Sequence, residues 1–152
     1  MVAYYRLIGY ENRDVADQDF RNDTVDAGEI GAGHSATALY AVTFRSNAAG
    51  RIATVQLRWE DPDSHQVTEI NGNFNTWDLA GSFEQADPRY QLAVVVAQYA
   101  EMLRHSPWAA GSFASQLVEH AYRLSSVLWD DPKVVEFASL VSRASQIRAL
   151  GN

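Results

Sequence analysis

Residues 51–60, RIATVQLRWE, carry the clearest strand pattern in the chain, because apolar and polar side chains alternate along them. Alternation with a period of two places the two kinds of side chain on opposite faces of a strand. One buried and one solvated face is typical of an antiparallel sheet. We therefore expect an antiparallel strand with a buried apolar face. The apolar face comprises Ala53, Val55, Leu57 and Trp59, and the polar face comprises Thr54, Gln56, Arg58 and Glu60.

Two further strands are expected before this stretch. Residues 4–10, YYRLIGY, are rich in aromatic and branched side chains, and residues 35–45, SATALYAVTFR, place apolar residues on one face. Residues 46–50 have the length of a hairpin loop and end in Gly50, which tolerates a positive φ. This spacing predicts a hairpin between residues 35–45 and 51–60.

After the stretch, the pattern changes from strand to helix. Residues 61–64, DPDS, stop the strand because proline cannot donate to a ladder, and a weaker strand over 67–70 closes at Asn71-Gly72. Residues 1–87 carry 14 acidic and 6 basic side chains, whereas residues 88–152 carry 5 and 6. The hydrophobic period lengthens to about 3.6 at the same place, which predicts a helical second half.

Three helices are expected in this second half. The first begins at Asp87-Pro88, an N-cap followed by proline, and it is apolar nearly all round as far as Leu103. Such a helix is expected to be central and the most buried element. The second helix follows Gly111 with Ser112 as its cap, and the third begins at Asp131-Pro132. The apolar stripes are Phe113, Leu117, Ala121, Leu124 and Leu128 on the second helix, and Val134, Phe137, Ala138, Val141 and Ala144 on the third.

Together these patterns predict an α+β fold. A mainly antiparallel sheet over residues 1–80 packs with a three-helix unit over residues 88–150. The length of 152 residues is enough for one domain with a core of its own. We expect a single cooperative domain over 1–152, with a β-rich part over 1–86 and a helical part over 87–152.

Composition excludes several classes of site. The chain has no cysteine, which excludes thiolate zinc sites, iron–sulfur clusters, a cysteine nucleophile and disulfides. The formal net charge of −7 disfavours non-specific binding to nucleic acid or to anionic lipid. No apolar run approaches the ~18 residues of a membrane span, and no signal peptide is visible at the N-terminus.

Two strings resemble a known bacterial family. Residues 5–13, YRLIGYENR, and residues 26–34, DAGEIGAGH, followed by SATALY at 35–40, resemble the region that follows the von Willebrand factor A (VWA) domain in YfbK-like proteins. Looser similarities are LRWEDP at 57–62 and Leu103-Arg104. The resemblance implies a C-terminal domain of unknown function, excised from a longer VWA-containing protein whose own N-terminus often carries a secretion or lipoprotein signal.

The metal site of the VWA domain does not transfer to this chain. In the family that site is built on an Asp-x-Ser-x-Ser motif, and no such motif occurs here. No catalytic, cofactor-binding or metal-binding residue is therefore assigned through the resemblance.

The segment 11–34 contains the densest group of candidate metal-binding or catalytic residues in the sequence. Clustered carboxylates suit calcium, but the spacing from Asp17 does not match an EF-hand, with Arg21 at the fifth position and Gly28 at the twelfth. The alternative is a solvated loop or short helix whose carboxylates cap turns and pair with Arg13 and Arg21. The carboxylates are Glu11, Asp14, Asp17, Asp19, Asp23, Asp26 and Glu29.

Glycines and histidines add little to a catalytic interpretation. Gly28, Gly31 and Gly33 precede a strand and lack a nearby lysine, so they favour a turn into the sheet over a phosphate loop. His34, with Ser35 and Asp26, contains the residue types of a nucleophilic triad, but nearness in sequence is not triad geometry. The other histidines, His65, His105 and His120, lack zinc-site spacing.

The tryptophans divide into two groups. Trp59 lies on the apolar face of its strand and is expected in the core. Trp77, Trp108 and Trp129 lie near the ends of elements and are expected to cover the core, with a partner interface as the alternative.

We expect a non-catalytic accessory or interaction domain that follows a VWA domain, braces it or presents a protein-binding surface. No cofactor is assigned, and the expected partners are proteins, either the adjoining VWA domain or another protein. The alternative is a calcium-binding or hydrolase-like module built on 11–34. Because the family layout places an extended apolar stretch before Tyr4, we also expect an open sheet edge beside residues 4–10, or one filled by a neighbouring copy. The alternative is that residues 4–10 are themselves a peripheral strand, from which no partner is missing.

Overall fold

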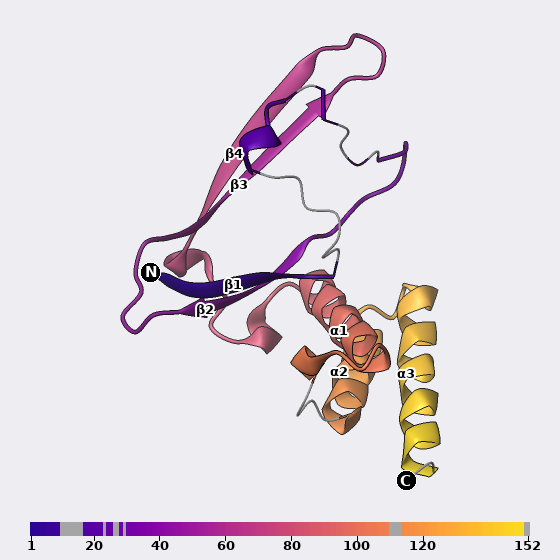
Figure 1. Cartoon of the computed structure of the whole chain (residues 1–152). Helices are drawn as coiled ribbons and strands as arrows, with labels where there is room; N and C mark the ends of the chain where they lie inside the picture. The colour runs from indigo at the N-terminus through magenta and orange to yellow at the C-terminus, as the bar shows by residue number, and fades with distance from the viewer. Residues whose placement is uncertain (10–16, 23, 26–27, 29, 110–113, 151–152) are drawn as a thin grey trace. The chain divides into compact units, whose positions relative to one another are not determined.

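The computed structural model has an α+β fold in two compact units (Figure 1). The strand unit comprises Met1–Ile8 and Tyr40–Ala80, and the helical unit comprises Gly9–Leu39 and Gly81–Asn152. Cooperative unfolding of the whole chain as one domain stays a prediction. The structure describes residues 1–9, 17–22, 24–25, 28, 30–109 and 114–150.

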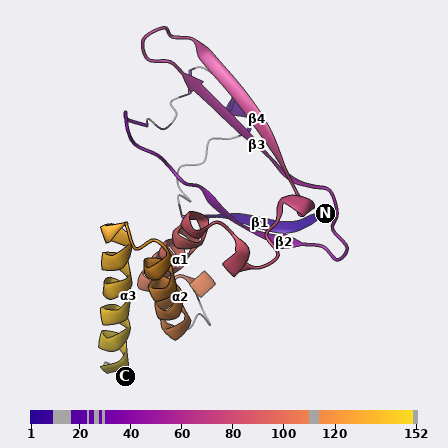
Figure 2. The ribbon, with the colours of Figure 1, turned by 180° about the vertical axis from the view of Figure 1, so that it is seen from behind.

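The strand unit contains two antiparallel two-stranded sheets. In the first, β1 (Val2–Ile8) pairs with β2 (Leu39–Phe44), and in the second, β3 (Arg51–Glu60) pairs with β4 (Val67–Asn75). Figure 2 shows β3 and β4 from behind as two long strands lying side by side. Within the described residues, β1 has β2 as its one neighbour in the strand order, so its other edge is open.

The predicted hairpin between residues 35–45 and 51–60 is wrong. Residues 46–50 instead lead from one sheet into the other, with a positive φ at Asn47 (61°) and Gly50 (104°). Gly50 is bound to the end of β4, because its N–H donates to Thr76 Oγ1 (3.0 Å) and its carbonyl accepts from the Thr76 N–H (2.9 Å). These bonds continue the β3–β4 pairing by one residue beyond Arg51 and Asn75.

The turn between β3 and β4 is closed by Asp61. Its Oδ1 accepts from the N–H groups of Asp63 (3.1 Å) and Ser64 (2.8 Å) and from the Ser64 hydroxyl (2.9 Å). The bonds from Ser64 are the main reason that the pKa of Asp61 lies below its usual value. The strand ends before Pro62 as predicted. However, β4 continues through Gly72 to Asn75, because an extended glycine keeps its place in the ladder.

The helical unit consists of α1 (Pro88–Leu103), α2 (Ala114–Val127) and α3 (Pro132–Leu150). Both predicted aspartate caps are confirmed. Asp87 Oδ1 accepts from the N–H groups of Arg89 (2.8 Å) and Tyr90 (3.3 Å), and Asp131 Oδ1 accepts from the Lys133 N–H (3.1 Å). The predicted cap Ser112 lies outside the described residues. None of the described helices has the length and apolarity needed to cross a membrane.

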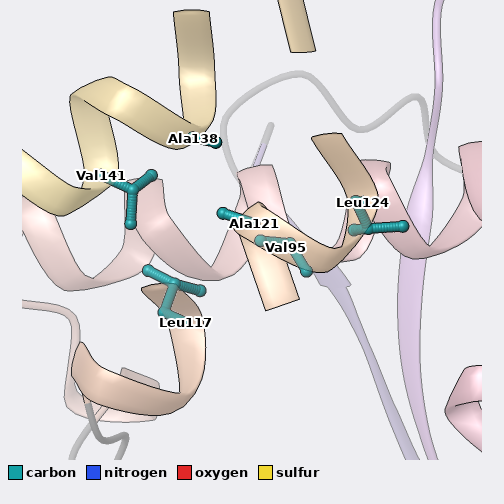
Figure 3. Packing of buried hydrophobic residues seen from close by; sticks show 6 residues of the cluster. All are labelled: Val95, Leu117, Ala121, Leu124, Ala138 and Val141. Carbon is teal, nitrogen blue, oxygen red and sulfur yellow. The ribbon is translucent and has the colours of Figure 1, made fainter. Parts of the chain in front are cut away.

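The core of the helical unit lies where the three helices meet (Figure 3). The predicted stripes of α2 and α3 are confirmed, since their central members are buried. The prediction that α1 is the most buried element is confirmed, since ten of its sixteen residues are buried or half-buried, a larger share than in α2 or in the described part of α3. The prediction that α1 is central is wrong, because α2 is the helix that packs against both others. Among the described side chains of α1, Val95 is the one buried apolar residue, whereas Tyr90, Val96 and Leu103 are 43–54% exposed. Three helices are too few to surround one of their number. The core residues are Val95, Leu117, Ala121, Leu124, Ala138 and Val141.

Candidate functional site

The β3–β4 hairpin presents an uncharged apolar face. Residues directly opposite each other in an antiparallel pair lie on the same face. The register pairs the apolar positions of β3 with β4 as Ala53–Phe74, Val55–Gly72, Leu57–Ile70 and Trp59–Thr68. These eight residues are called the apolar hairpin face below.

The apolar hairpin face is exposed, so the prediction that the apolar side of residues 51–60 is buried is wrong. Its five large members are 41–56% exposed. Trp59, which was expected in the core, is one of them. The physical reason is that β3 and β4 form a two-stranded sheet with no third strand among the described residues. Two strands alone cannot bury a face. The five members are Val55, Leu57, Trp59, Ile70 and Phe74.

Gly72 leaves an open position in this face, which is called the notch below. A Cβ placed on Gly72 would meet no heavy atom within 4 Å. Val55 lies across the ladder from it, and Ile70 and Phe74 lie two residues away on the same strand and the same face. An apolar side chain of a partner could therefore enter the notch and contact all three.

The opposite face of the hairpin is polar. Thr54 Oγ1 donates to Asn73 Oδ1 (2.9 Å), Gln56 lies opposite Asn71, and Arg58 lies opposite Glu69. The two faces of one hairpin thus differ sharply in polarity. A substitution at Gln56 or Asn71 is therefore a matched control for one on the apolar hairpin face.

The helical unit contains an apolar groove of about 220 Å³. It is lined by all three helices, for example by Met102, Leu117 and Val141. Binding pockets for small molecules combine an apolar lining with a few convergent polar groups that orient the ligand. Ser145 is the one residue of the groove lining, apart from Tyr99, that carries a polar side-chain atom. The groove is thus better suited to packing than to orienting a polar substrate.

Two polar side chains of α1 are buried, which the sequence pattern did not predict. Gln91 Nε2 donates to the carbonyls of Glu84 (3.2 Å) and Ala86 (2.7 Å), and its Oε1 accepts from Arg123 of α2. Glu101 accepts from the Ser106 hydroxyl (2.6 Å). Both side chains are engaged in bonds that hold backbone segments and a second helix in place. A polar residue on an apolar helix resembles a solvated stripe in sequence, so only the partners reveal its burial.

His120 is a second polar group of the helical unit with an unusual setting. Its Nδ1 is buried and has no hydrogen-bond partner among the described residues, and the ring packs edge-on against Phe83 at 5.3 Å. The pKa of nearby Glu84 lies below its usual value, chiefly because its own backbone N–H and Ser82 donate to the carboxylate, with smaller contributions from His120 and Arg123. These contacts fasten the segment before α1 to α2.

The acidic segment is described only in part. Most of the carboxylates of the calcium-binding alternative lie outside the described residues, as does the Asp17 side chain. In the part of the chain that the structure describes, no three His, Asp or Glu side chains are placed to hold a metal ion. The carboxylates outside the described residues are Glu11, Asp14, Asp23, Asp26 and Glu29.

The glycines of this segment form a turn, as predicted. The His34 N–H donates to the Gly31 carbonyl (3.0 Å), and Gly33 has a φ of 77°. The His34 ring lies against Gly31, where its Nδ1 is 3.2 Å from the position of an added Cβ. A side chain at position 31 would crowd the His34 ring, and glycine avoids this contact.

The three remaining tryptophans do not cover the core. Trp77, Trp108 and Trp129 are 59–77% exposed. The expectation that they lie over the core is wrong, because side chains in that position would lose most of their contact with solvent.

Comparison with known proteins places the chain in a family. Residues 1–147 match the family model described as "Uncharacterized protein YfbK, C-terminal". The chain is 25% identical over 167 aligned positions to "Uncharacterized protein YfbK" of Escherichia coli (strain K12), and the alignment covers 96% of this chain and 28% of the relative. No solved structure matches it. The chain thus spans little more than a quarter of that relative, and it belongs to the family of YfbK C-terminal domains.

Proposed function

We propose that the chain is a non-catalytic accessory domain that follows a VWA domain and docks onto protein through the apolar hairpin face. The observation that carries the proposal is the exposure of five large apolar side chains on one uncharged face. Half-exposed side chains of this size leave roughly 500 Å² of apolar surface in solvent. Patches of about 300–600 Å² on a monomer are often functional.

Two features of the described part of the helical unit fit a structural role. Gln91 and Glu101, the buried polar side chains of α1, are engaged in bonds to backbone or to neighbouring side chains. The groove of the helical unit lacks the convergent polar groups with which an enzyme orients a substrate.

The VWA element of the proposal rests on family membership and on the strings at residues 5–13 and 26–34. The match covers 28% of the E. coli relative, so most of that protein lies outside this domain. Sequencing the gene upstream of Met1 tests this element. A VWA domain with an Asp-x-Ser-x-Ser motif there supports it, and any other neighbour contradicts it.

Photo-crosslinking in the native organism tests the docking. A photoreactive amino acid at position 57 lies on the apolar hairpin face, and the same amino acid at position 56 lies on the polar face of the same strand. We expect position 57 to crosslink to protein, within the same polypeptide or to another one, and position 56 to crosslink far less. Equal crosslinking at the two positions, or none at position 57, contradicts the proposal.

A further inference from the structure

We infer that the apolar hairpin face is an intramolecular docking surface for the part of the polypeptide that precedes this domain, and that an apolar side chain of that part fills the notch at Gly72. This inference rests on the proposed function and identifies the partner. The evidence is the size of the face, the length of chain outside the domain and the shape at Gly72.

The size of the face argues against a second copy of the chain. The large members expose roughly 500 Å² per molecule. A permanent homodimer buries about 1,000 Å² or more per partner, roughly 65% of it apolar, which is more apolar area than this face exposes. A segment tethered in the same polypeptide has an effective concentration in the millimolar range, so a contact too weak to join separate molecules is still populated. A face of this area therefore suits a tethered partner.

The length of the relative supplies such a partner. The matched family model describes the C-terminal part of YfbK, and the chain covers 28% of the E. coli relative. More than two thirds of that protein thus lies outside the match, and the name of the family places it before this domain. A segment of that size is ample to reach the hairpin.

The chemistry of the face determines which kind of side chain the preceding part must present to it. None of its eight residues is charged, so the docking segment must also be apolar where it makes contact. Interfaces are dominated by a few side chains that enter well-packed pockets. The notch bounded by Val55, Ile70 and Phe74 is the place for such a side chain.

A substitution that fills the notch distinguishes specific docking from non-specific hydrophobic binding. Gly72→Val makes the face more apolar but closes the notch, and its backbone conformation does not require glycine. A face that binds non-specifically through its hydrophobicity would bind as well or better after this substitution. Asn71→Val adds the same side chain to the polar face of the same strand and is the matched control.

Trp59 reports whether the face is covered. In a background with Trp77, Trp108 and Trp129 replaced by phenylalanine, and with every tryptophan of the preceding part replaced in the same way, the tryptophan fluorescence comes from Trp59 alone. Acrylamide quenching is measured in the 152-residue chain and in the full-length polypeptide. We expect the quenching constant to fall by about twofold or more in the full-length polypeptide, because docking excludes water from the face. Gly72→Val should restore quenching there, and Asn71→Val should not. Circular dichroism of each variant verifies that it folds.

Each other outcome overturns the inference. Protection of Trp59 that appears in the 152-residue chain as its concentration rises identifies a second copy as the partner. Protection in that chain at every concentration means that its own residues cover the face. Protection in the full-length polypeptide that Gly72→Val leaves intact removes the role of the notch. If Trp59 stays accessible while position 57 crosslinks to a different protein, this inference fails and the proposed function survives.

Discussion

Gly72 lies directly opposite Val55 in the β3–β4 ladder, and the glycine leaves the space beside Val55 open. A strand interior usually carries a β-branched side chain at such a position, because glycine weakens a strand by its entropy and by its missing contacts. The hairpin thus gives up local stability at the centre of its apolar face. Docking of a partner side chain at the notch accounts for a glycine at this position.

The first prediction concerns that local cost. In the 152-residue chain, Gly72→Val should raise the free energy of unfolding by up to about 1 kcal/mol, because valine favours the strand and contacts Val55. Urea denaturation measures the change. A loss of stability would contradict the open space at Gly72.

The second prediction concerns the core of the helical unit. Leu124 is 0% exposed, whereas Leu103 of α1 is 54% exposed. Leu124→Ala should lower the free energy of unfolding by about 2–5 kcal/mol, and Leu103→Ala by less than about 1 kcal/mol. Equal losses in urea denaturation would mean that the helices pack differently.

The third prediction concerns the buried amide of Gln91. Gln91→Ala leaves Arg123 and the carbonyls of Glu84 and Ala86 without this partner, which should cost about 1–3 kcal/mol. Gln116→Ala on the exposed surface of α2 is the control and should change stability by less than about 0.5 kcal/mol. Chemical denaturation of both variants provides the comparison, and a Gln91→Ala chain as stable as the control would argue against the bonds.

The fourth prediction concerns the contribution of Asp131 to stability at low pH. The pKa of Asp131 lies below the ordinary value of 3.8, chiefly because the Arg89 side chain donates to the carboxylate, and the Lys133 N–H adds a further bond. A depressed pKa in the folded state contributes stability above the unfolded value, and this stability is lost as the pH falls through the folded value. Asp131→Asn retains a capping side chain but removes the charge.

The stability difference between wild type and Asp131→Asn should therefore be constant above about pH 5 and shrink below about pH 3.8. Thermal unfolding across this pH range measures it. A difference that persists unchanged at pH 3 would assign the contribution to something other than the ionised carboxylate.

Local structure could be predicted from the sequence where one segment determines it. The strand over 51–60 has the predicted bounds, and Asp87 and Asp131 cap their helices as expected. Alternation does not specify which strand lies alongside, so the partner of 35–45 was wrong. Likewise, an amphipathic pattern identifies an apolar face without identifying what covers it. That is why the β3 half of the candidate site was identified in advance but interpreted as core, whereas Gly72 and Phe74 of β4 were missed because the strand was expected to end at Ile70.

Hydrogen exchange of β3 tests the central claim most directly. Amide exchange over Arg51–Glu60 is compared between the 152-residue chain and the full-length polypeptide. Docking onto the apolar hairpin face suppresses the local opening of the hairpin, so the account predicts slower exchange across β3 in the full-length polypeptide. Identical exchange in the two would contradict the claim that this face docks onto the preceding part of the protein.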